Sequence, residues 1–298
     1  MSAVTRTSTP RQAEGTTPSP PAQVAQAVSS RKRRQPAIRS VASAVLPPLA
    51  LALVIGTVWQ IAAMTAFAGR SYMLPAPAEV WNAAVTNAEL IGRSMWVTFS
   101  SAVIAYTMSV VIAVTAAVAM SRSTFIERSV YPFAVGIQVT PVVSVIPIII
   151  LWFGFGMRSI VVSAGLIAFF PVLSNTLLGL RSVDPGLVDL FRLHRSGAAQ
   201  RFFRLELPSA LPQIVAGMRI SAGLGVIGVI TGEFLIGTAG TYGGIGVRIV
   251  MAQATMQTAL MFACVFAASA LGLIFFWIVS GAGNRMLKSW HTSARTRD

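Results

Sequence analysis

Charged residues are scarce in this sequence. Only 11% of the 298 residues are Asp, Glu, Lys or Arg, whereas soluble globular chains carry about 25%. Hydrophobic residues make up 54% of the chain, too many for a disordered protein. The composition excludes an ordinary water-soluble enzyme and indicates an integral membrane protein.

Cysteine and histidine are almost absent. The single cysteine, Cys264, excludes an intrachain disulfide and a cysteine-cluster metal site. The two histidines, His194 and His291, lie in polar segments, so we expect no metal site and no Ser-His dyad within the membrane. The pattern G-x-x-x-x-G-K-[ST] is missing too, so any ATP that drives this protein is hydrolysed by another polypeptide.

Long apolar runs are what the sequence has instead. A helix of about 20 apolar residues crosses the bilayer core, and most of the long runs here are free of charge. We predict an all-α membrane protein with six transmembrane helices, at 43–67, 96–120, 131–153, 159–180, 213–237 and 258–281.

The 23 basic residues are unevenly distributed between the connections. Most lie in four segments, 1–42, 121–130, 181–212 and the residues after 281. By the positive-inside rule these segments face the cytoplasm, with both termini inside. The net charge of +14 is therefore spread over helix ends, which argues against nucleic-acid binding. We expect a multi-pass protein of the plasma (inner) membrane.

The two ends of the chain are polar. Residues 1–42 are rich in Ser, Thr, Pro and Gln, and we predict a disordered basic cytoplasmic tail there. Its run Arg31-Lys32-Arg33-Arg34 is expected to bind anionic membrane lipid. The six-helix domain then occupies 43–282, and 283–298 form a short cytoplasmic tail.

Small residues recur at a spacing of four in the fifth predicted span. They are Gly217, Ser221 and Gly225, followed by Gly228 and Gly232. Small residues at this spacing let membrane helices approach closely. We therefore predict that the fifth span is a packed, central helix.

The connection 181–212 is polar and long. Asp184-Pro185 predicts a helix start, and Leu207-Pro208, followed by Leu211-Pro212, predicts a break before the next span. A polar segment of this length indicates either a surface that contacts a partner or a helix that lies on the membrane. Both interpretations remain open at this point.

Residues 189–208, DLFRLHRSGAAQRFFRLELP, resemble the E-A-A loop of ABC importer permeases. The resemblance is to the nitrate, sulfonate, taurine and thiamine-precursor branch and covers roughly 45–290. It is also carried by Thr140-Pro141 with Pro147, by LWFGFG at 151–156, FFPV at 169–172, LRSVDP at 180–185, and Gly232-Glu233-Phe234 with GGIG at 243–246. The resemblance implies a type I ABC importer permease fold with a cytoplasmic coupling helix.

The loop departs from the family pattern at several positions. Asp189 stands where the family has Glu, and it keeps the negative charge. Leu190 and Phe191 replace the two alanines. Arg195 stands at the position of the usual glycine, and Gly197 follows two residues later. The helix turn is where we expect the geometry to differ.

The resemblance implies that the loop docks on an ATP-hydrolysing subunit. Phe202 and Phe203 are candidate apolar knobs for a cleft on that subunit, or they face the bilayer surface and the adjacent spans. The full predicted docking set is Asp189, Arg195, Gly197, Arg201, Phe202, Phe203, Arg204 and Pro208.

Three polar residues are candidates for the translocation pathway. A carboxylate within a span usually faces a bundle interior or an aqueous cavity, so Glu233 either lines the pathway or caps the Gly-rich loop that follows it. Asn175 and Thr176 either touch solute or bond to a neighbouring helix. Pro141 and Pro171 interrupt predicted spans, where prolines are tolerated if neighbours satisfy the freed carbonyls.

The implied function is that of a permease subunit in an ATP-driven importer. It would translocate a small solute of the sulfonate, nitrate, taurine or pyrimidine-precursor type, delivered by an extracytoplasmic solute-binding protein. The resemblance further implies a permease homodimer with ATP and Mg on the ATP-binding subunits, no cofactor on this chain and no enzyme activity of its own. The alternative is an ion-coupled secondary transporter, but no internal repeat is evident and Glu233 is the only acid within a span.

Overall fold

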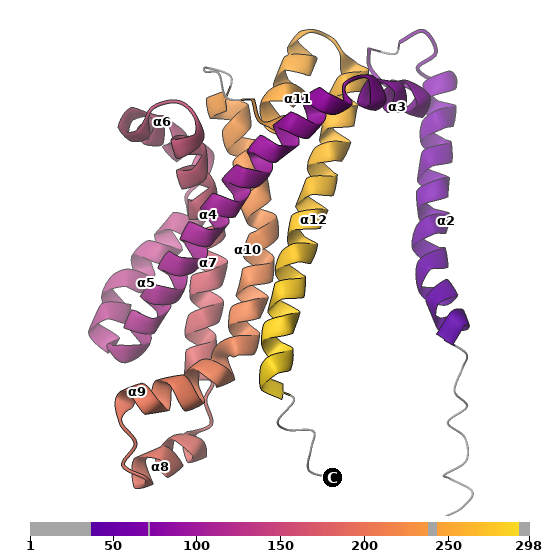
Figure 1. The fold of residues 1–298 in the computed structure, drawn as a ribbon. Helices are drawn as coiled ribbons and strands as arrows, with labels where there is room; N and C mark the ends of the chain where they lie inside the picture. The colour runs from indigo at the N-terminus through magenta and orange to yellow at the C-terminus, as the bar shows by residue number, and fades with distance from the viewer. Residues whose placement is uncertain (1–36, 71, 238–242, 292–298) are drawn as a thin grey trace, which may run out of the picture. The chain divides into compact units, whose positions relative to one another are not determined.

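The computed structural model describes residues 37–70, 72–237 and 243–291, and the regular elements in this part of the chain are all helices (Figure 1). They are α2 (Ala37–Met64), α3 (Pro77–Thr86), α4 (Ala88–Arg122), α5 (Thr124–Val139), α6 (Val142–Phe153), α7 (Met157–Arg181), α8 (Pro185–Leu193), α9 (Ala198–Arg201), a π-helical turn (Phe202–Glu206), α10 (Leu207–Ile236), α11 (Ile245–Ala254) and α12 (Thr258–His291). The chain divides into two units, 1–57 and 58–298. All packing described below lies within the second.

Five helical stretches among the described residues are long and apolar enough to cross a bilayer. They are Leu46–Met64, Ala88–Arg122, Met157–Arg181, Ala198–Ile236 and Thr258–Lys288. The pair α5 and α6 makes a sixth span only if a broken pair is counted as one. The fold is therefore all-helical with five or six apolar spans.

The third predicted span, 131–153, is not one continuous helix, and that prediction is wrong. The chain bends by 106° between α5 and α6. Thr140 has an extended backbone, with φ −74° and ψ 124°, and Pro141 follows it. Proline disfavours helical conformation in the residue before it and has no N–H for the helix ladder.

Helices α2 and α12 extend into the segments predicted to be tails. α2 begins at Ala37, inside the segment predicted to be a disordered tail, and α12 continues to His291. The rest of the predicted tails, 1–36 with the basic run Arg31-Lys32-Arg33-Arg34 and 292–298, lies outside the described residues.

Helices α7 and α10 pack closely because small residues line their contact. A methyl group added at Gly217 would lie 2.7 Å from the Pro171 carbonyl oxygen, and one at Gly228 would meet α7 at 2.8 Å. The Ser221 hydroxyl donates a hydrogen bond to the Ala168 carbonyl at 2.6 Å. The prediction of a packed fifth span is confirmed.

The bundle has two distinct ends (Figure 1). The turn between α4 and α5, the helices α8 and α9, and the end of α12 lie together at the lower end of the view. Helices α3 and α11 and the end of α10 lie at the upper end. The basic segments 121–130 and 181–212 therefore share one end, as the positive-inside rule requires of segments on one side.

Candidate functional site

Helix α8 starts where the sequence predicts. The Asp184 carboxylate accepts a hydrogen bond from the Gly186 N–H at 2.7 Å, and Pro185 is the first helical residue. An aspartate cap satisfies an N–H that has no partner within the helix, and proline has no N–H to satisfy there. No residue of this helix is buried: Val188 and Phe191 are half-buried, and its other residues are exposed within this chain.

Arg195 has a left-handed backbone, with φ +51°. It follows the end of α8, where the Arg195 N–H donates to the Arg192 carbonyl at 2.9 Å and the Ser196 N–H to the Phe191 carbonyl at 3.1 Å. This is the Schellman arrangement, in which glycine usually occupies the left-handed position. A side chain there costs about 1–2 kcal/mol. The left-handed backbone at this position explains why a glycine suits it. Gly197, with φ −65°, does not take over that conformation.

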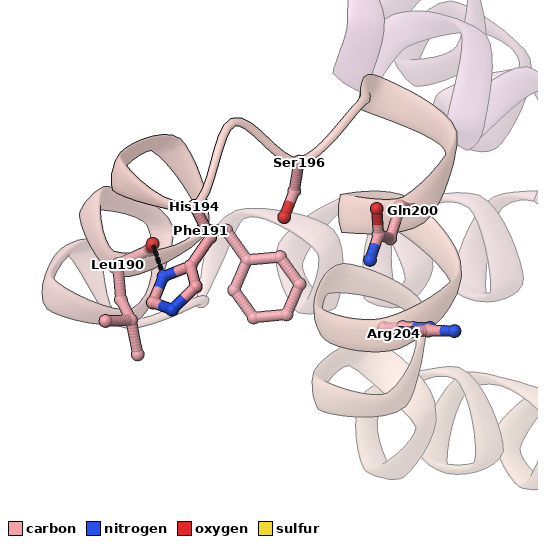
Figure 2. A pocket seen from close by; sticks show the side chains of 6 residues that line it. All are labelled: Leu190, Phe191, His194, Ser196, Gln200 and Arg204. Carbon is pink, nitrogen blue, oxygen red and sulfur yellow. Dashed lines mark hydrogen bonds between the residues drawn. The ribbon is translucent and has the colours of Figure 1, made fainter.

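A hollow of about 380 Å³ lies between α8 and α9. In Figure 2 the Phe191 ring points from α8 into this hollow, with His194 on one side and Gln200 and Arg204 on the other. The His194 Nδ1 atom lies 2.9 Å from the Leu190 carbonyl oxygen. The hollow therefore combines an apolar floor with polar and basic edges.

Phe202 and Phe203 have different environments. Phe202 is half-buried and packs against Leu180 and Ile214, with the Arg122 guanidinium 4.7 Å from its ring centre. Phe203 is 62% exposed. Of the two predicted knobs, only Phe203 is free to enter a cleft on another protein.

The charged residues of the predicted docking set also differ in their environments. Asp189 is exposed and pairs with Arg192 at 3.2 Å, and Arg204 is exposed as well. Arg201 instead donates from its Nε atom to a Glu206 carboxylate oxygen at 2.8 Å. Arg201 is thus partly engaged within the chain, whereas Asp189 and Arg204 remain accessible.

The predicted helix break at Leu207-Pro208 is wrong. The helix passes through Pro208 because the preceding turn widens, and the Leu207 N–H donates to the Phe202 carbonyl five residues back. Pro208 lies in the first turn of α10, half-buried, where the missing N–H is tolerated. Single π-helical turns of this kind are common at functional sites.

Glu206, at the end of this turn, was not singled out from the sequence. Its side chain is 12% exposed and binds two arginines, Arg122 of α4 at 2.6 Å and Arg201 at 2.8 Å. The sequence signal that could have pointed to Glu206 is its position as an acidic residue between two leucines, next to a proline. A second ion pair at the same end joins Arg181 of α7 to Glu127 of α5.

Glu233 is completely buried near the end of α10. Its carboxylate accepts hydrogen bonds from the Thr98 hydroxyl at 2.8 Å and from the Gly246 N–H at 2.7 Å. The Thr98 oxygen accepts from the Ile245 N–H at 2.8 Å. Glu233 and Thr98 thus satisfy the first N–H groups of α11, because the N-cap residue Gly244 has no side chain to do so.

This geometry is that of a helix cap, one of the two roles considered for Glu233. A methyl group at Gly244 would lie 2.0 Å from a Glu233 carboxylate oxygen, so the carboxylate occupies the space of a side chain there. A role for Glu233 in the translocation pathway stays a prediction.

Asn175 and Thr176 lie on α7 at its contact with α10. Asn175 donates from its side-chain amide to the Pro171 carbonyl at 2.8 Å and lies against Gly217. Thr176 is fully buried, and its hydroxyl has no hydrogen-bond partner among the described residues. Contact of either residue with solute stays a prediction.

No described group of three or more His, Cys, Asp or Glu side chains is placed to hold a metal ion. The chemistry of the described site is that of docking and packing, carried by ion pairs, caps and one exposed aromatic side chain.

Comparison with known families identifies the chain. Residues 109–288 match the family described as the binding-protein-dependent transport system inner membrane component. The chain belongs to this family. The matched residues include the whole segment 181–212, Glu206 and Glu233.

Two relatives match over nearly their whole length. The formylaminopyrimidine transport permease protein ThiX of Halalkalibacterium halodurans is 31% identical over 243 residues, which are 81% of this chain and 95% of ThiX. The riboflavin transport system permease protein RibX of Chloroflexus aurantiacus is 31% identical over 268 residues, 88% of this chain and 97% of RibX.

A solved structure supports the same fold. The inward-facing MetNI methionine ABC transporter superposes with a TM-score of 0.57 at 18% identity, covering 69% of this chain and 98% of the matched chain. The chain is therefore an ABC importer permease of the type I fold in the nitrate, sulfonate and taurine group, a multi-pass inner-membrane transport subunit rather than an enzyme. The family also decides against the ion-coupled secondary transporter.

Proposed function

We propose that this permease works with a separate ATP-binding subunit that docks on α8, α9 and the π-helical turn, here called the coupling segment (residues 184–206). The observation that carries the proposal is the exposure of this segment. Helix α8 buries no residue, Phe203 projects from the turn, and a hollow lies between α8 and α9. Such a surface is typical of an interface, where an aromatic anchor and a pocket supply most of the binding energy.

ATP and Mg would be held by the partner subunit. Asp189, Arg195 and Arg204 would lie at the rim of the interface, where charges affect docking rate and selectivity more than affinity. The end of the bundle with the basic segments 121–130 and 181–212 would face the cytoplasm, with both termini on that side.

We further propose that two copies of this chain form the translocation unit and receive solute from an extracytoplasmic binding protein. The solute is proposed to be a small nitrogen heteroaromatic compound of the pyrimidine-precursor type. Support comes from the names of ThiX and RibX, both of which refer to heteroaromatic compounds. Sulfonate, nitrate and taurine are the alternatives to test beside it.

Co-purification tests the docking proposal. The chain is expressed with the ATPase encoded beside it, extracted in mild detergent, and the ATPase retained per permease is measured. Wild type should retain the ATPase, and Phe203→Ala should bind it about thirtyfold more weakly, because truncating an aromatic anchor costs about 2 kcal/mol or more.

Phe155→Ala is the matched control. Phe155 is 61% exposed, close to the 62% of Phe203, but it lies in the turn between α6 and α7 rather than in the coupling segment. Its replacement should leave ATPase retention unchanged. A wild-type chain that retains no ATPase would overturn the proposed partner, whereas equal retention by both variants would overturn the choice of Phe203.

A further inference from the structure

Glu206 connects parts of the chain that the backbone does not. It stands at the junction between the coupling segment and α10, whereas Arg122, its partner at 2.6 Å, ends α4. The two residues are 84 positions apart. Helix α10 follows the coupling segment directly, so a movement of the segment reaches α10 through the main chain. Helix α4 has no such covalent connection and depends on side chains.

The π-helical turn places three charged side chains together. Arg201 and Glu206 are five residues apart and bond at 2.8 Å. In an α-helix, side chains that meet are three or four residues apart, so this pair depends on the wider turn. The turn therefore allows Glu206 to bind Arg201 within the segment and Arg122 on α4 at the same time.

The contact with α4 is strengthened by burial and by Phe202. The side chains of Glu206 and Arg122 are 12% and 33% exposed. Arg122 also lies over the Phe202 ring at 4.7 Å, and that ring packs on the same buried cluster of Leu180, Ala210 and Ile214 as residues of α4 do. Hydrogen bonds between two charged groups are about twice as strong as neutral ones, and partial burial reduces their screening by salt.

We propose that the Glu206–Arg122 pair transmits movement of the coupling segment to α4 and that both are positioning residues for transport. Apolar contacts can slide when the segment moves, whereas a short pair of opposite charges holds its two partners together. Arg201 has a different place, because its bond to Glu206 stays within the segment and its turn. This inference rests on the proposed docking of an ATP-binding subunit.

The test follows the position of the end of α4 in the assembled complex with the ATPase. In a Cys264→Ala background, spin labels are attached at Thr124→Cys, the first residue of α5 and two positions after α4, and at Arg285→Cys on α12. Labelled chains are diluted with unlabelled ones so that only distances within one chain are measured. The distance distribution is recorded without nucleotide and after trapping with ATP and vanadate.

In the labelled chain without further substitutions, trapping should shift the distance between the two labels. Arg122→Gln should lose the shift while it retains the ATPase and its hydrolysis of ATP, since Arg122 lies on α4, outside the coupling segment. Glu206→Gln should lose the shift as well. Arg201→Gln should keep the shift, because the Arg122 bond remains. Arg93→Gln, which removes an exposed ion pair on the opposite part of α4, should also keep it.

The outcomes separate this inference from the docking proposal. Absence of the ATPase from the unchanged chain overturns the docking proposal itself. With the ATPase retained, an unchanged shift in Arg122→Gln overturns the proposal that the Glu206–Arg122 pair transmits movement to α4. A loss of the shift in Arg201→Gln equal to that in Arg122→Gln overturns it as well. Arg122→Gln is decisive if Glu206→Gln fails to fold, because Arg122 is the more exposed partner and Glu206 keeps Arg201.

Discussion

The two carboxylates near the ends of α10 are held in different ways. Glu206, just before the helix, is bound by two guanidinium groups at the basic end of the bundle. Glu233, in the last turn, is completely buried and accepts hydrogen bonds from a hydroxyl and a backbone N–H. One carboxylate joins separate elements by charge, whereas the other completes the start of a short helix.

The difference follows from the surroundings. Near water, a charged pair can form between elements at a modest desolvation cost. Within the apolar bundle, a buried polar group is costly unless its hydrogen bonds are satisfied. We therefore expect Glu233 to matter chiefly for the stability of the fold, and Glu206 chiefly for transmission.

Glu233→Ala should have the largest effect on stability. It removes the acceptor of the buried Thr98 hydroxyl and of the Gly246 N–H, and it opens a cavity. The expected loss is about 3 kcal/mol or more, measured as a lower unfolding midpoint in detergent. Glu89→Ala, which removes an exposed carboxylate of α4, is the control and should change the midpoint little. Equal effects of the two variants would contradict the burial argument.

Gly244→Ala should have the next largest effect. Its backbone, with φ −67°, accepts alanine, but the new methyl group would lie 2.0 Å from the Glu233 carboxylate. The resulting overpacking should cost about 1–3 kcal/mol in unfolding free energy. At Gly243 the nearest atom is a flexible Arg248 nitrogen at 3.5 Å, so Gly243→Ala should be tolerated. If Gly244→Ala and Gly243→Ala have the same unfolding free energy, the Glu233 carboxylate does not lie against Gly244 as described.

Arg195→Gly should have the smallest effect, and in the opposite direction. Glycine relieves the left-handed backbone at φ +51° and should stabilise the end of α8 by about 1 kcal/mol. Slower hydrogen exchange of the α8 amides would report it. Arg195→Ala removes the same charge but keeps a side chain, so it should give no protection. Protection in both variants would assign the effect to charge rather than to the backbone.

Much of the architecture could be predicted from local signals. Apolar length, basic connections and the Asp184-Pro185 pair each depend on nearby residues, and the small residues of α10 follow the spacing that close packing needs. The continuous helix over 131–153 failed because the bend at Pro141 prevailed over the apolar pattern.

The site was less predictable because its decisive contacts join distant residues. The Glu206–Arg122 pair spans 84 positions, and no spacing rule connects them. Phe202 differs from Phe203 because it packs on a cluster that contains Leu180 and Ile214, which are distant from it in the sequence. The pairing of Arg201, a member of the predicted docking set, with Glu206 was not predictable, because residues five apart do not pair in an ordinary helix.

The measurement that tests this contrast most directly compares Glu206→Gln with Glu233→Gln in the same complex. For each, the unfolding midpoint and the shift between labels at Thr124→Cys and Arg285→Cys on ATP–vanadate trapping are recorded. Glu206→Gln should lose the shift with a small change in midpoint. Glu233→Gln should lower the midpoint more and keep the shift while folded. A Glu206→Gln chain that keeps the full shift, beside a Glu233→Gln chain that loses it, would contradict the roles assigned to the two carboxylates.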